Sequence, residues 1–168
     1  NSMKYFNKSL TLTLSYLFFI SLTFTALASP TAKETLTAEL NQHAGKVIYL
    51  DFWASWCVPC RKSFPWMAQM QTKYKQDGFT VISINVDADK SLADTFLIDN
   101  PINFPVVFDP NGELAKEFKL KGMPSSFIID KSGNIVKAHT GFFTNKMLEY
   151  EKELASLIFE NTTYVSDK

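Results

Sequence analysis

Cysteine and histidine are scarce in this chain of 168 residues, which contains only two of each. A structural zinc ion needs four ligands, so a zinc site would have to combine both cysteines with the distant His43 and His139. An excess of either charge is also absent, because 17 basic side chains balance 17 acidic ones. A basic stripe is the usual electrostatic mark of a nucleic-acid-binding domain, so we expect no nucleic-acid partner.

The N-terminal part of the sequence has the features of a targeting segment. Lys4 and Lys8 precede an uncharged run over residues 10–27, and Ala26-Leu27-Ala28 has the small–x–small form of a signal-peptidase site. The run is also about long enough for a membrane anchor, although its serine and threonine residues favour cleavage. Both interpretations predict an extracytoplasmic domain, periplasmic after cleavage or held at the membrane by residues 1–28.

The rest of the sequence predicts one α/β domain. We assign residues 29–34 to a linker, 35–160 to the domain and 161–168 to a polar tail. Alternating strands and helices followed by a hairpin predict a mixed sheet with helices on both faces. We expect Thr144 to cap the last helix and Leu148 to lie on its buried side. The predicted strands span about 46–53, 79–86, 104–108, 126–130 and 135–139, and the predicted helices about 34–43, 57–76, 89–98, 113–118 and from 144 onward.

The two cysteines lie three residues apart in the run Trp56-Cys57-Val58-Pro59-Cys60, directly after a predicted buried strand. Side chains at i and i+3 share one face of a helix's first turn, so the two sulfurs can bridge without backbone strain. Unpaired N–H groups and the positive end of the helix dipole favour the thiolate of Cys57. Pro59 fits this first turn, because a backbone N–H there has no intrahelical acceptor and the missing N–H of proline therefore costs no hydrogen bond. A C-x-x-C pair in this setting is typical of redox chemistry.

Other uses of the cysteine pair remain open. A disulfide that closes only a two-residue gap adds little stability, so a purely structural bridge is disfavoured. In an oxidising compartment the pair would not stay reduced without a donor. Two thiolates suit Cu(I), so copper binding or metal delivery is the main alternative to redox chemistry.

The segment Asp51-Phe52-Trp53-Ala54-Ser55-Trp56-Cys57-Val58-Pro59-Cys60 resembles the active-site segment of the thioredoxin superfamily. Pro65, five residues past the second cysteine, and Gly122-Met123-Pro124 before a strand are further matches. The export signal and an added helix–strand insertion between about Ser91 and Phe108 resemble the extracytoplasmic TlpA-like branch. The similarity spans about residues 35–159 and implies a thioredoxin-like fold, with a central mixed sheet flanked by helices.

The resemblance implies roles for four catalytic residues. Cys57 would be the attacking thiolate, and Cys60 would resolve the mixed disulfide. Pro124 matches the family's cis-proline, and an X–Pro bond is the ordinary place for a cis peptide; its position alone would equally fit a strand-starting proline. Asp51 matches the family's proton acceptor for the second cysteine, and burial in its apolar strand would raise its pKa. The alternative for Asp51 is a carboxylate that reaches the surface or caps a turn.

Two departures from the superfamily bear on this chemistry. Thioredoxins commonly carry a lysine near the aspartate, and the matching residue here is Ser83. Without that cation, desolvation is less opposed, so we expect Asp51 to hold its proton to higher pH than in thioredoxin. Copper-delivering relatives use a C-x-x-x-C spacing with a distant histidine, whereas this chain has two residues between its cysteines. His139 is therefore more typical of a half-exposed polar strand residue than of a ligand.

We expect four substrate-binding residues around the cysteines, namely Trp56, Val58, Pro59 and Met123. An extended substrate would pair with the backbone of Met123, and Trp56 would form an apolar rim, with shielding of the core as its alternative role. Val58 and Pro59 lie between the cysteines and add no charge or donor, so we expect a moderately reducing couple.

The sequence as a whole predicts an extracytoplasmic protein disulfide oxidoreductase that reduces disulfides, with a disulfide-forming oxidant as the alternative direction. We expect protein substrates that carry cysteines or disulfides. A reductase outside the cytoplasm also needs a membrane donor that supplies electrons by thiol–disulfide exchange. We further expect a monomer that uses no cofactor and holds no metal.

Overall fold

The computed structural model describes residues 29–160. The predicted targeting segment, residues 1–28, and the predicted polar tail, residues 161–168, lie outside the described residues. Within the described part, no helix has both the length and the apolar character needed to span a membrane.

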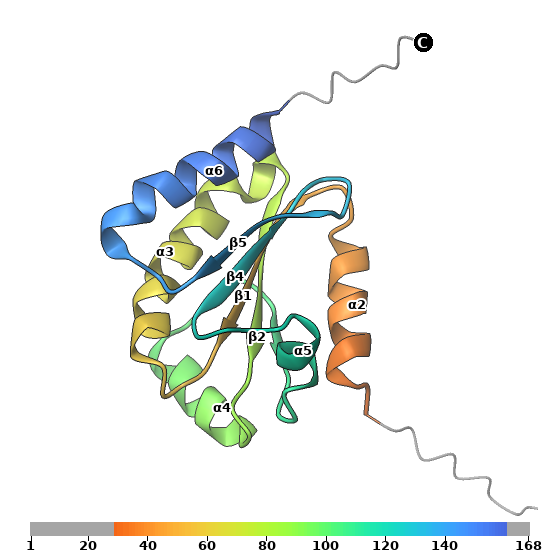
Figure 1. Ribbon diagram of the computed structural model, residues 1–168, viewed down its shortest axis with the longest axis vertical. Coiled ribbons are helices and arrows are strands. Elements are labelled where there is room, and N and C mark those ends of the chain that lie inside the picture. The colour runs from red at the N-terminus through yellow and green to blue at the C-terminus, as the bar shows by residue number, and fades with distance from the viewer. Residues whose placement is uncertain (1–28, 161–168) are drawn as a thin grey trace, which may run out of the picture.

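A five-stranded mixed sheet forms the centre of the molecule, in the order β3-β2-β1-β4-β5 (Figure 1). The parallel part contains β1, β2 and β3, and β4 and β5 add two antiparallel pairings. The predicted helix–strand unit is present as α4 and β3, and β3 forms one edge of the sheet. The strands are β1 (Val47–Trp53), β2 (Phe79–Asn85), β3 (Val106–Phe108), β4 (Ser125–Ile129) and β5 (Ile135–Thr140).

Helices cover both faces of this sheet, as predicted. Buried residues of α3, α4 and α6 pack in one cluster, and those of α2 and α5 pack in a second cluster on the opposite face. Figure 1 shows α3 and α6 on one side of the sheet and α2 and α5 on the other. The helices are α2 (Ala32–Gln42), α3 (Val58–Tyr74), α4 (Lys90–Asp99), α5 (Glu113–Glu117) and α6 (Met147–Phe159).

The central strand β1 explains how the sheet acquires two cores. All seven of its residues are buried, because helices cover the sheet above and below. Alternation along the strand sends Tyr49 and Trp53 into the cluster under α3 and sends Leu50 and Phe52 into the cluster under α2. Asp51, between Leu50 and Phe52, therefore points to the α3 side.

Two helices begin two or more residues away from the predicted position. The first helix begins at Ala32 rather than near Glu34, because Thr31 and Glu34 form a reciprocal capping box. The prediction for Thr144 was wrong, since Thr144 opens a short 3-10 turn, has no capping hydrogen bond, and α6 begins three residues later. The prediction for Leu148 was also wrong: the buried face of α6 carries Tyr150, Leu154 and Ile158 at helical spacing, and Leu148 is exposed because it lies off that face.

Candidate functional site

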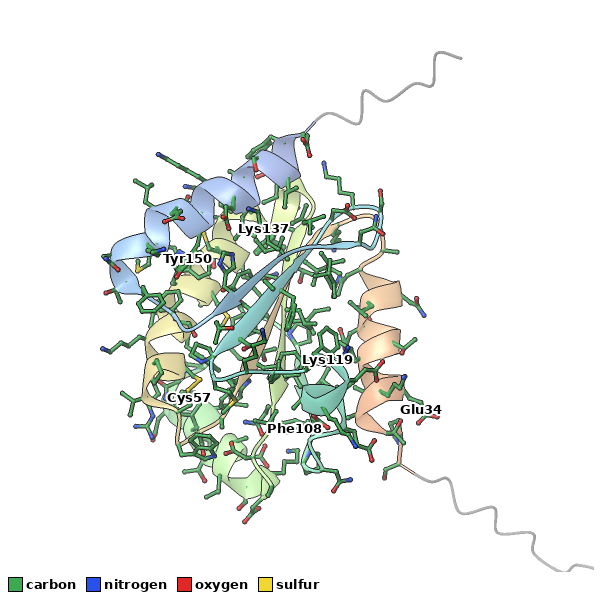
Figure 2. The ribbon with its side chains drawn as sticks, in the orientation of Figure 1. Glu34, Cys57, Phe108, Lys119, Lys137 and Tyr150 are labelled. Carbon is green, nitrogen blue, oxygen red and sulfur yellow. A yellow bond between two sulfur atoms is a disulfide. The ribbon has the colours of Figure 1, made fainter. Side chains whose placement is uncertain are left out.

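The cysteine pair lies where β1 gives way to α3. A disulfide joins Cys57 and Cys60, with an S–S distance of 2.03 Å. Cys57 is the N-cap of α3, and its Sγ accepts a hydrogen bond of 3.3 Å from the backbone N–H of Cys60. The N–H of Cys57 in turn donates to the carbonyl of Ala54 at 3.0 Å. Pro59 lies in the first turn, as predicted, and Figure 2 shows the yellow disulfide beside the Cys57 label.

Exposed apolar residues surround the buried sulfurs. Cys57 and Cys60 are only 4% and 1% exposed in this disulfide form. Trp56 and Val58 are 64% and 62% exposed. Pro59 is exposed as well. A partner that reaches Cys57 would therefore meet an apolar surface first.

The turn that precedes the cysteines is held by Asp87, a residue that the sequence reasoning missed. Asp87 is buried after β2 and accepts hydrogen bonds from the N–H and the hydroxyl of Ser55, both at 3.0 Å. Asn85 also donates to Asp87, at 2.8 Å. From the helix side, Nη2 of Arg61 donates to the carbonyl of Ser55 at 2.8 Å. An acidic residue just past a buried parallel strand was the available signal, since such strand ends commonly border sites.

The peptide bond between Met123 and Pro124 is cis, which confirms the sequence prediction. Pro124 is buried, and its carbonyl accepts a hydrogen bond of 2.8 Å from the N–H of Gly141. Met123 is partly buried and packs against the apolar cluster that contains Cys57 and Cys60. The structure thus brings Met123 and the cysteine pair to one cluster, although they come from distant parts of the sequence.

Asp51 lies beneath α3, deep in the molecule. It is 1% exposed, which confirms the predicted burial. Its neighbours on the same face of β1 contact α3 directly, because Tyr49 packs edge-on against Trp66 at 5.3 Å between ring centroids and Trp53 packs against Phe64 at 4.7 Å. Asp51 therefore lies under the N-terminal half of the helix whose first turn holds the disulfide.

The environment of Asp51 disfavours its charge. Burial raises the pKa of the Asp51 carboxyl well above its ordinary value. Its Oδ2 atom has no hydrogen-bond partner among residues 29–160. Ser83 is its register partner on β2, so a hydroxyl group and not a cation neighbours the carboxyl on that strand. An acid with a raised pKa can accept a proton near neutral pH, which is the property required of a general base.

The two histidines lie apart from the cysteine pair. His139 lies on β5 with its Nε2 2.9 Å from Oε2 of Glu153, in a half-buried contact whose alignment does not meet hydrogen-bond geometry. His43 is the C-cap of α2, a helix on the opposite face from α3. In the described range, no three histidine, cysteine or acidic side chains come together as a metal cluster would require.

Comparison with known proteins identifies the family of this chain. Residues 22–157 match the family Redoxin. The chain belongs to the Redoxin family. This membership confirms the resemblance on which the thioredoxin-like assignment rested, and the mixed sheet with flanking helices confirms the fold.

Individual relatives of this Redoxin chain agree with the assignment. Thiol-disulfide oxidoreductase ResA of Bacillus subtilis is 34% identical over 110 residues, which cover 66% of this chain and 62% of ResA. The chain therefore spans less than two thirds of that relative's length. A Chlorobium tepidum protein provisionally named thiol:disulfide interchange protein DsbE has a solved structure with a TM-score of 0.69 and 46% identity, covering 71% of this chain and 84% of that one. StoA from Bacillus subtilis gives a TM-score of 0.56 at 29% identity, with coverages of 65% and 84%.

Proposed function

We propose that this Redoxin-family protein is a thiol–disulfide oxidoreductase that reduces protein disulfides. The observation that carries the proposal is the Cys57–Cys60 disulfide at the N-terminus of α3, with Asp51 buried beneath that helix. The names of the relatives support it, since ResA is called a thiol-disulfide oxidoreductase and the Chlorobium protein a thiol:disulfide interchange protein.

The first step uses Cys57 as the nucleophile. In the reduced protein, the Cys57 thiolate attacks one sulfur of a substrate disulfide and forms a mixed disulfide, while the other substrate sulfur leaves as a thiolate. The N–H of Cys60, which points at Cys57 Sγ in the structure, favours the thiolate, as does the positive end of the α3 dipole.

The second step uses Cys60 and Asp51. The Cys60 thiol gives its proton to the ionised Asp51 carboxylate, and the resulting thiolate attacks Cys57 Sγ. The second substrate sulfur then leaves as a thiolate, and both substrate thiolates take protons from solvent. The substrate has gained two electrons, and the protein carries the Cys57–Cys60 disulfide that the structure contains.

Substrate binding is assigned to the residues around the sulfurs. The exposed side chains of Trp56 and Val58, with Pro59 between the cysteines, offer an apolar surface to unfolded or loosely folded protein segments. The backbone of Met123, preceding the cis bond to Pro124, offers an edge to which an extended segment adds by β-pairing.

We place the reaction outside the cytoplasm and in the reducing direction. Residues 1–28 act as a signal peptide or anchor, and the catalytic domain, which works as a monomer, extends to residue 160 and includes α2 from Ala32 onward, three residues before the predicted boundary. Val58 and Pro59 provide no charge that would stabilise the Cys57 thiolate further, which favours a reducing couple. A membrane donor that exchanges thiols for disulfides returns the electrons, and no cofactor takes part.

Reduction of insulin disulfides by dithiothreitol, followed by turbidity, tests this function. The wild-type chain accelerates the reaction and Cys57→Ser abolishes the acceleration, because the nucleophile is lost. The matched variant Cys60→Ser keeps the nucleophile but accumulates a mixed disulfide, which mass spectrometry detects. Full activity in Cys57→Ser contradicts the proposal. Negligible exchange in the wild type, together with tight Cu(I) binding by both cysteines, would favour a metal-binding module instead.

A further inference from the structure

Two serines flank Asp51 in the sheet. The register pairs Asp51 with Ser83 on β2 and with Ser126 on β4. Directly opposed residues of neighbouring strands project to the same face of a sheet, so both hydroxyl groups lie on the α3 side with the carboxyl. Both serines are buried. A buried carboxyl whose Oδ2 has no hydrogen-bond partner among the described residues thus has a hydroxyl-bearing neighbour on each side.

The two hydroxyl groups differ in what they already bind. Ser83 Oγ donates its hydrogen to the carbonyl of Pro105, at 3.2 Å. Ser126 Oγ instead accepts a hydrogen bond from the Tyr49 hydroxyl, at 2.8 Å. A serine hydroxyl has one hydrogen to donate and two lone pairs to accept. Ser83 has therefore committed its hydrogen to a backbone carbonyl, and Ser126 has its own hydrogen left to donate.

The distance between β1 and β4 suits such a donation. Opposed Cβ atoms in an antiparallel pair are about 4.5–5.5 Å apart, a separation that a hydrogen bond from a serine hydroxyl to an aspartate carboxylate can span. The Tyr49 bond fixes the orientation of Ser126 and polarises its hydroxyl, because hydrogen bonds in a chain strengthen one another. Tyr49 is thereby a second member of the same chain of donors.

We propose that Ser126, oriented by Tyr49, donates a hydrogen bond to the ionised Asp51 carboxylate and so maintains the form that accepts the Cys60 proton. Ser126 is a positioning residue in this scheme, and it takes the place of the cation that is missing at Ser83. The inference rests on the base role of Asp51 given under the proposed function. It adds a device that counteracts part of the desolvation of that carboxylate.

Other ionisable groups near this chain of donors belong to several elements. Tyr150 lies on α6, on the side of the sheet that carries the disulfide (Figure 2). The pKa of Tyr49 is raised, mainly by burial and next by the charge of Asp51, with smaller effects of Tyr150 and Glu153. The groups to consider are Tyr49 on β1, Cys60 on α3, Asp87 after β2, His139 on β5, and Tyr150 and Glu153 on α6. Because these groups could also move the Asp51 titration, the test needs a control among them.

The direct test is a carbon-13 NMR titration of the Asp51 carboxyl in the full chain with its cysteines reduced. Ser126→Ala removes the donor, so we expect the midpoint to rise by about one pH unit, a tenfold change in proton affinity. Tyr49→Phe keeps the Ser126 hydroxyl but removes the hydrogen bond that polarises it, so the Asp51 midpoint should shift in the same direction by a smaller amount. Ser83→Ala, the matched control, leaves the midpoint unchanged, as does His139→Gln. Ser126→Thr, which keeps a hydroxyl, restores the wild-type midpoint.

A second readout connects the titration to catalysis. The rate at which Cys60 resolves a preformed mixed disulfide rises with pH as Asp51 ionises, and in Ser126→Ala this profile moves to higher pH by the same amount. An unchanged midpoint in Ser126→Ala overturns the inference, and so does an equal shift in Ser83→Ala or His139→Gln. The two proposals can fail separately. If the Asp51 midpoint shifts as expected in Ser126→Ala but Cys57→Ser retains full insulin reduction, the proposed function is contradicted and the hydrogen bond from Ser126 is still supported.

Discussion

The two faces of the central sheet are built from the same strands but differ in polarity around Asp51. The strand residues that pack beneath α2 and α5 are mostly aliphatic or aromatic, among them Ile48, Leu50, Phe52, Ile82 and Ile84, with the buried Ser125 as the register partner of Phe52. The face beneath α3 and α6 carries polar groups among its apolar ones, namely Tyr49, Asp51, Ser83, Asn85 and Ser126. Figure 1 shows these two helical layers on either side of the sheet.

This difference in polarity means that the α2 side of the sheet mainly stabilises the fold, whereas the α3 side carries the groups proposed for catalysis. An apolar side chain gains stability from burial, whereas a buried polar group costs free energy unless it is hydrogen-bonded. Asp51 is buried, its pKa is raised, and its Oδ2 lacks a partner among the described residues, so its presence opposes stability. Neighbouring residues on β1 should therefore respond to mutation in opposite ways, depending on the face to which they point.

The largest stability loss is expected on the α2 side. Phe52 is fully buried and packs against Phe118 and Phe127, at ring-centroid distances of 5.2 and 6.0 Å. Phe52→Ala should lower the free energy of unfolding by about 3–5 kcal/mol, because it removes a buried ring and leaves a cavity. Urea unfolding measures the loss. Insulin reduction per folded molecule should stay near the wild-type value. If Phe52→Ala kept wild-type stability but lost activity, the assignment of stability to the α2 side and of chemistry to the α3 side would be wrong.

The neighbouring change on the α3 side should slow catalysis and raise stability. In Asp51→Asn, resolution by Cys60 should slow by about 10²-fold at neutral pH, the lower range for loss of a general base. The raised pKa of Asp51 means that the folded wild type retains a proton that the unfolded chain releases. The wild type therefore loses stability relative to Asp51→Asn as pH rises from the ordinary carboxyl pKa to the raised one.

Unfolding by urea at several pH values between 4 and 8, together with stopped-flow resolution kinetics, measures both effects. Leu50→Ala, at the adjacent position on the other face, is the matched control, because it should lower stability without a pH-dependent difference. A stability difference between wild type and Asp51→Asn that stays constant with pH would contradict the raised pKa.

A smaller change is expected at the exposed start of α3. Val58 lies between the cysteines and is exposed, so a substitution there alters charge without disturbing either core. A partly protonated histidine in Val58→His would stabilise the Cys57 thiolate and make the couple more oxidising, by about 30 mV for each 1.4 kcal/mol of added stabilisation. Equilibration with glutathione measures the potential. Val58→Leu is the neutral control, and an equal shift in both variants would exclude charge as the cause.

The smallest effect concerns substrate binding at the surface. Trp56→Ala removes an exposed aromatic side chain, so the free energy of unfolding should change by less than about 0.5 kcal/mol. The KM for insulin should rise a few-fold, whereas the rate with a small disulfide such as cystine should not change. Parallel assays with both substrates check this, and an equal loss with cystine would show that Trp56 acts on the cysteines rather than on protein substrates.

Much of this arrangement was predictable from sequence because it depends on local patterns. Uninterrupted apolar runs predicted β1 and β2, and the C-x-x-C run after β1 predicted the position of the site. The cis bond before Pro124 was predictable from the family resemblance, since position alone left it open. Asp87 and Ser126 were not found, because their contacts are with residues distant in sequence, Ser55 in the turn after β1 and Tyr49 on β1. The prediction for Thr144 was wrong because threonine is a common N-cap residue, whereas here a 3-10 turn over Thr144–Lys146 precedes α6.

The reduction potential of the Cys57–Cys60 couple tests the central claim most directly. It is measured in the full chain by equilibration with glutathione and dithiothreitol buffers, with the thiols quantified after quenching. A protein disulfide reductase should give a value between about −270 and −200 mV, the range of thioredoxin and the glutaredoxins. A value near about −120 mV, that of a strong disulfide-forming oxidant, would contradict the reducing direction.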